Sequence, residues 1–127
     1  MRGGDPGLYI ELMAKAARDA IIFVEGLSDQ DFLIDEKTQH AVSMCLIVIG
    51  ENAKRLFAVA PDAMRGHDDI PWISMARMRD RIAHGYEDLH MGVIWKTVRD
   101  DLPPLVKALE TMLLSYPDPE SSTHDRA

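Results

Sequence analysis

The sequence predicts an all-α protein, an antiparallel bundle of four to five helices, and composition and pattern both support this. Hydrophobic residues make up 46% of the 127 residues but aromatic residues only 6%. A core of aliphatic side chains, alanine and methionine suits packed helices better than sheets, which favour β-branched and aromatic residues. Four segments have apolar residues at three- and four-residue steps, and the short connections between them imply antiparallel neighbours.

The first helix is expected over about residues 8 to 25. Its apolar stripe consists of Met13, Ala17, Ala20, Val24 and Leu27. Gly26 stands where a left-handed cap would end the helix. The segment from Ser28 to Ile34 carries its own acidic residues, and we expect it to be a short loop.

The second helix is expected over about residues 36 to 60. Asp35 is a suitable N-cap for it, because its carboxylate can accept a hydrogen bond from a free backbone N–H. The helical period is kept by Ala41, Met44, Cys45, Val48, Leu56 and Val59. Pro61 should end the helix, since the residue before a proline is disfavoured in the α region.

A polar turn over residues 61 to 70 leads to a third helix, expected from about Trp72 to Ala83. Pro71 fits its first turn, and Gly85 is the expected stop. The last helix, about residues 91 to 115, carries the clearest stripe: Met91, Ile94, Val98, Leu102, Leu105, Leu109 and Met112. Pro103 and Pro104 should kink this helix near Asp101 or split it, because they remove two backbone donors.

The chain length allows one compact domain. We expect a disordered leader over residues 1–7, a single helical domain over residues 8–116 and a disordered polar tail over residues 117–127.

The net charge of -7 argues against a protein that coats nucleic acid with its whole surface, but it permits a local basic site. A lone cysteine, Cys45, and the absence of a long apolar run predict a cytoplasmic protein without a membrane span.

Arg79 and His84, at the end of the third helix, are the residues best suited to catalysis. RNA cleavage without a metal needs a base for the ribose 2′-hydroxyl and a group that stabilises charge on the phosphate. Histidine suits the first task near neutral pH, and the permanently charged arginine suits the second. Asp80 is positioned to orient either residue.

Helix geometry limits this interpretation. At about 100° per residue, Arg79 and His84 lie about 140° apart on an unbroken helix, so they cannot converge on one phosphate. Either the helix ends by Ala83 and Gly85 lets His84 turn back, or two copies face each other in a dimer. The two possibilities are compatible.

Simpler interpretations also apply. An arginine near a histidine at a helix C-terminus commonly reflects the helix dipole alone. A zinc site at His84 is poorly supported, because His90 is six residues away and no cysteine or carboxylate stands at a recognised spacing. Tyr86 either caps the end of the bundle or exposes a hydroxyl that is open to modification.

At these residues the sequence resembles the HEPN superfamily, and specifically the HepT-like toxins encoded beside minimal nucleotidyltransferase antitoxins. Arg79, Asp80 and His84 match the superfamily pattern, and Tyr86 completes the R-x4-H-x-Y motif of the HepT-like subgroup. Three other stretches are also similar to the family: residues 49–56 (IGENAKRL), Ile70-Pro71-Trp72, and Trp95 with Asp101-Leu102-Pro103. The similarity covers about residues 8 to 115.

The resemblance implies a helical homodimer whose Arg–His pairs line a shared cleft. It implies RNA cleavage without a metal or cofactor, leaving a 2′,3′-cyclic phosphate. His84 would be the acid/base group, Arg79 would hold the phosphate and Asp80 would support both. The antitoxin, which is similar to enzymes that transfer adenylate from ATP, would modify Tyr86. A bulky, negative adenylate there would fill the site and repel RNA.

RNA binding also requires local positive charge. Between residues 72 and 86, three arginines face one aspartate, a local excess of two positive charges. Arg77 and Arg81 are therefore candidate RNA contacts.

Glu51 either reaches the cleft as a supporting residue or pairs with Lys54 or Arg55 on the helix surface, and the surface pair is favoured. A glycine inside a helix, such as Gly50, lowers helix stability by about 1 kcal/mol relative to alanine. Close helix packing is favoured over a role at the cleft as the reason for this glycine.

Two other functions remain open. One is a non-catalytic HEPN module that binds substrate or scaffolds the nucleotidyltransferase. The other is an unrelated helical protein that dimerises through the stripe on the last helix.

Overall fold

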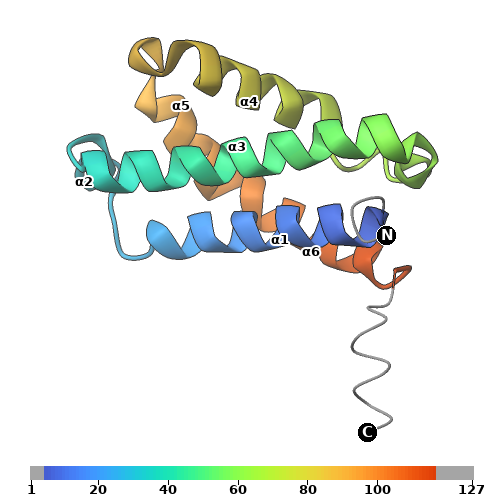
Figure 1. The fold of residues 1–127 in the computed structure, drawn as a ribbon. Coiled ribbons are helices and arrows are strands. Elements are labelled where there is room, and N and C mark those ends of the chain that lie inside the picture. Colours follow the sequence, from blue (N-terminus) through green and yellow to red (C-terminus); the bar gives the residue numbers. More distant parts are fainter. Residues whose placement is uncertain (1–4, 117–127) are drawn as a thin grey trace, which may run out of the picture.

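The computed structural model describes residues 5–116, and within them the regular structure consists of helices alone, as predicted (Figure 1). In chain order these are α1 (Pro6–Phe23), α2 (Asp29–Leu33), α3 (Glu36–Val59), η2 (Pro61–Met64), α4 (Trp72–Gly85), η3 (Tyr86–Asp88), α5 (Met91–Lys96), η4 (Thr97–Asp101) and α6 (Leu102–Leu113). No helix in this part of the chain combines the length and apolar character needed to cross a membrane.

The first helix begins earlier than predicted. The Asp5 carboxylate caps α1 by accepting a hydrogen bond from the Gly7 N–H at 2.9 Å, and Pro6 occupies the first turn, where its missing N–H costs nothing. The predicted leader boundary at residue 7 is therefore wrong. Gly26 has a φ of 79°, as expected for a left-handed residue after the helix. The remainder of the predicted leader, and the tail, lie outside the described residues.

The segment from Ser28 to Ile34 is not a loop, which corrects the prediction. The Ser28 hydroxyl accepts from the Asp31 N–H at 3.1 Å, and the Asp31 carboxylate accepts from the Ser28 N–H at 3.0 Å. This reciprocal capping box starts the short α2, and the buried Phe32 anchors it to the core. Asp31, one of the acidic residues of this segment, thus forms part of the cap of a helix.

The predicted break in the last helical region is confirmed. A π-helical segment, η4, separates α5 from α6 at Asp101, and Pro103 and Pro104 fall in the first turn of α6. Helix α4 extends two residues beyond Ala83 and ends at Gly85, the predicted stop, and Pro71 is its N-cap residue.

The helices form layers, with α3 in the middle (Figure 1). Helices α1 and α6 contact each other, and α1 also packs along α3. The core between them includes Ile10, Met13, Ile49, Leu56 and Leu109, and the stripe from Ile94 to Met112 is buried as predicted. Met44 and Val59, expected in the core, are at least half exposed instead. Helix α4 lies on the opposite side of α3 from α1 (Figure 1).

Candidate functional site

Helices α3 and α4 are in close contact at Gly50. A Cβ atom at this position would collide with the Cβ of Arg79 and the backbone oxygen of Met75. The packing interpretation of this glycine is therefore confirmed. Because its neighbour across the contact is Arg79 itself, Gly50 also determines how near the arginine lies to the side chains of α3.

The Arg79 guanidinium is held by two carboxylates. Its Nε donates to Glu51 Oε2 at 2.8 Å, and its Nη1 donates to Asp80 Oδ1 at 3.1 Å. The favoured prediction for Glu51, a surface pair with Lys54 or Arg55, is wrong, and the alternative role as a supporting residue fits. The physical reason is the close approach at Gly50, which brings Arg79 within reach of Glu51.

Lys54 is a member of this cluster that the sequence did not reveal. Its Nζ donates at 2.9 Å to Asp80 Oδ1, the same oxygen that accepts from Arg79. This hydrogen bond is the main reason that the pKa of Asp80 lies below its ordinary value; partial desolvation opposes the effect and the bond from Arg79 adds to it. The only signal in the sequence was the spacing of Glu51 and Lys54, three residues apart on one face of a helix.

His84 lies close to this cluster along α4 but is not bonded to it. Because α4 is unbroken through Gly85, the predicted turn at Ala83 is wrong, and Arg79 and His84 leave the helix about 140° apart. Asp80, however, stands four residues before His84 and so shares its face. The Arg79 side chain bends toward that face to reach Asp80. His84 itself is exposed.

The two candidate RNA contacts also lie on the outer side of α4. Arg77 and Arg81 are both exposed, and Arg77 precedes His84 by seven residues, two helical turns. The outer side of α4 therefore presents three cationic or titratable side chains beside the Arg79 cluster.

The structure agrees with the first of the two interpretations of Tyr86, a packed position at the end of the bundle, and not with the second. Its hydroxyl is buried and has no hydrogen-bond partner among the described residues, so the expectation of an exposed hydroxyl is wrong. The ring packs against His40 of α3, with ring centroids 5.2 Å apart. Tyr86 directly follows the last residue of α4, and His40 on α3 is the ring that it meets there. His40 was not identified from the sequence.

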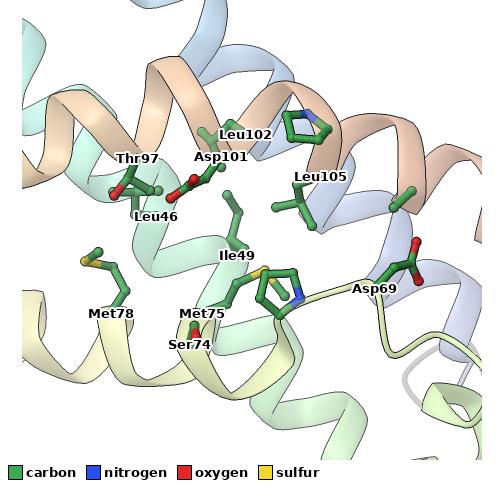
Figure 2. A pocket seen from close by; sticks show the side chains of 13 residues that line it. Leu46, Ile49, Asp69, Ser74, Met75, Met78, Thr97, Asp101, Leu102 and Leu105 are labelled. Atoms are coloured by element: carbon green, nitrogen blue, oxygen red, sulfur yellow. The ribbon is translucent and has the colours of Figure 1, made fainter.

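A cavity of about 500 Å³ lies on the other flank of α4, between α3, α4 and α6 (Figure 2). Its walls are mainly apolar and include Ile49, Met75, Met78 and Leu105. Met78 and Asp80 are two residues apart and therefore leave the helix on opposite flanks. The cavity thus contains none of the residues proposed for catalysis. Within residues 5–116, no group of three or more His, Cys, Asp or Glu side chains is arranged to hold a metal ion.

Comparison with known proteins gives a consistent result. A family model described as Ribonuclease HepT-like matches residues 13–112. A probable ribonuclease HepT of Thermococcus cleftensis is 40% identical over 104 residues, which cover 82% of this chain and 92% of that protein. A putative RNase of Methanocaldococcus jannaschii is 35% identical, covering 76% of this chain and 77% of its own length. Another from Caldanaerobacter subterraneus is 32% identical, covering 85% and 94%. No solved structure gave a significant match.

Proposed function

Since the chain belongs to the HepT-like ribonuclease family, we propose that it is a metal-independent endoribonuclease and the toxin of a toxin–antitoxin pair. The observation that carries this proposal is the arrangement of Arg79, which two carboxylates hold on the same helix that carries the exposed His84. An arginine that is already oriented loses less freedom when it binds a phosphate.

The proposed chemistry uses both residues. Neutral His84 takes the proton of a ribose 2′-hydroxyl, and the 2′-oxygen forms a bond to the adjacent phosphorus. The bond from phosphorus to the 5′-oxygen breaks, and that oxygen receives the proton from the His84 imidazolium, which returns to its neutral form. The products are a 2′,3′-cyclic phosphate and a free 5′-hydroxyl.

Arg79 stabilises the charge that develops on the phosphate. A guanidinium has five N–H donors, and Glu51 and Asp80 occupy two of them. The remaining donors are available for two oxygens of the phosphate, which is the geometry that arginine favours. Arg77 and Arg81 would contact neighbouring phosphates.

A second copy of the chain would complete the cleft. The unbroken α4 removes the possibility that a turn at Gly85 brings His84 back toward Arg79. In the proposed homodimer, an arginine and a histidine would stand on both sides of one phosphate.

The proposed control is adenylylation of Tyr86 by a minimal nucleotidyltransferase antitoxin. In that step the Tyr86 oxygen forms a bond to the α-phosphorus of ATP, and pyrophosphate leaves. Because the hydroxyl is buried against α3, the ring must first leave His40. Once modified, the side chain is too large to return, so the adenylate would stay on the surface near His84.

Incubation of the purified protein with total RNA in EDTA tests the nuclease. Wild-type protein should cleave, His84→Ala should lose about a thousandfold in rate, and the products should end in cyclic phosphate. His90→Ala is the matched control, since His90 is also an exposed histidine near this end of the bundle. Equal inactivity of all three proteins would contradict the nuclease. Binding of RNA without cleavage would instead indicate the non-catalytic module.

A further inference from the structure

Lys54 has no role in the chemistry described above, although it is bonded to the site. We propose that Lys54 is an RNA-binding residue that contacts the same phosphate as Arg79 and offsets the charge of Asp80. This inference rests on the proposed ribonuclease function and deepens it. It assigns a phosphate contact to α3, whereas the sequence motif assigns all such contacts to α4.

Charge balance is the first argument. The cluster contains two carboxylates, Glu51 and Asp80, and the two cations Arg79 and Lys54. With Lys54 present its net charge is zero, and without Lys54 it would be negative. The whole chain already carries a net charge of -7. An RNA phosphate approaching Arg79 would then meet a negative cluster on a negative body.

Geometry is the second argument. The Lys54 ammonium and the Arg79 guanidinium bond to one oxygen atom, Asp80 Oδ1, at 2.9 and 3.1 Å. The distance between the Nζ and Nη1 atoms is therefore at most about 6 Å. Two donors at that separation can contact two oxygens of a single phosphate. The ammonium has three donors, of which Asp80 takes one, and the Lys54 side chain is 43% exposed.

The Lys54–Asp80 pair is exposed, which argues against a role in folding stability alone. Exposed ion pairs contribute little to folding stability, typically below about 1 kcal/mol. The pair Lys15–Asp19 is comparable, with a distance of 2.7 Å and an exposed lysine, and it lies on α1 within one helix. Lys15 therefore offers a control that removes the same charge and the same kind of ion pair from another element.

The experiment compares Lys54→Gln, Lys54→Arg and Lys15→Gln with the wild type. Steady-state cleavage of a single-stranded RNA should show a KM about tenfold higher for Lys54→Gln, with a smaller change in kcat. Lys54→Arg and Lys15→Gln should both stay near the wild-type KM. In the His84→Ala background, Lys54→Gln should lower the slope of log affinity against log salt by about 0.7, the value expected for one phosphate contact on a single strand.

Each outcome separates the two proposals. If the wild type cleaves RNA and Lys54→Gln behaves like Lys15→Gln, the role of Lys54 is overturned while the nuclease stands. If Lys54→Arg is as impaired as Lys54→Gln, the charge argument is wrong. If the wild type neither cleaves nor binds RNA, the nuclease itself fails, and this inference fails with it. Thermal melting of each variant checks that loss of activity does not reflect unfolding.

Discussion

The outer and inner sides of α4 differ sharply at its C-terminal end. On the outer side, His84 is exposed, and Asp80, bonded to Arg79 and Lys54, lies one turn away. On the inner side, Tyr86 places its hydroxyl in a buried position against α3 without a partner. A single residue, Gly85, separates His84 from Tyr86 in the sequence, yet His84 is accessible in the single chain and the Tyr86 hydroxyl is not. In the single chain, His84, proposed for cleavage, is thus accessible to RNA. Tyr86, proposed as the site of adenylylation, becomes accessible only when its ring leaves α3.

Gly50→Ala should have the largest effect on this arrangement. The added Cβ would collide with a backbone oxygen, which cannot move without α4, and with Arg79. We expect a loss of about 1–3 kcal/mol in the free energy of unfolding, as for other overpacked sites, and a loss of about a hundredfold in RNA cleavage. Chemical denaturation and the cleavage assay measure the two effects.

Gly92→Ala is the matched control for this substitution. Gly92 is helical, like Gly50, but a Cβ there meets no atom within 4 Å. It should leave cleavage unchanged and raise stability slightly, because alanine favours a helix over glycine. If both glycine variants behave alike, the contact between α3 and α4 does not position Arg79.

Some of the features on which these predictions depend could be predicted from the sequence, and others could not. The period of apolar residues was sufficient to locate α3 and the buried stripe from Ile94 to Met112, because helical spacing directly reports which face is buried. The prolines located the break at Asp101 for an equally local reason. Local patterns therefore predicted most of the fold.

The contacts within the site depended on the distance between two helices, which no local pattern reports. Glu51 has three basic candidates within reach, and only the close approach at Gly50 decides in favour of Arg79. The inward direction of Tyr86 likewise depends on its packing against His40 of α3, a contact that no local pattern reports. The motif itself is visible in the sequence, whereas the choice of Glu51 as the partner of Arg79 and of His40 as the neighbour of Tyr86 is not.

His40→Ala should change the inner side alone, with an intermediate effect. Without the imidazole, the Tyr86 ring loses its neighbour on α3 and should become more accessible. Nitration by tetranitromethane, followed by peptide mapping, should modify Tyr86 several times faster in this variant than in the wild type. The buried Tyr9 serves as an internal control, because its environment on α1 is unchanged. Equally fast nitration of Tyr86 in both proteins would mean that its hydroxyl is already open.

Tyr86→Phe should have the smallest effect and the opposite sign. The substitution removes a buried hydroxyl that has no hydrogen-bond partner in the described part of the chain, and such a group costs free energy in the folded state. We expect the free energy of unfolding to rise by about 1 kcal/mol. RNA cleavage should persist, because Tyr86 takes no part in the proposed chemistry. Co-expression with a minimal nucleotidyltransferase should add no adenylate, as judged by intact mass.

Tyr9→Phe provides the comparison, since the Tyr9 hydroxyl is not among the buried groups without a partner. It should bring no gain in stability. A Tyr86→Phe variant that is less stable than the wild type would show that the hydroxyl does find a partner in the folded protein. A variant that no longer cleaves RNA would place Tyr86 in the catalytic chemistry, and the division between the two sides of α4 would then be wrong.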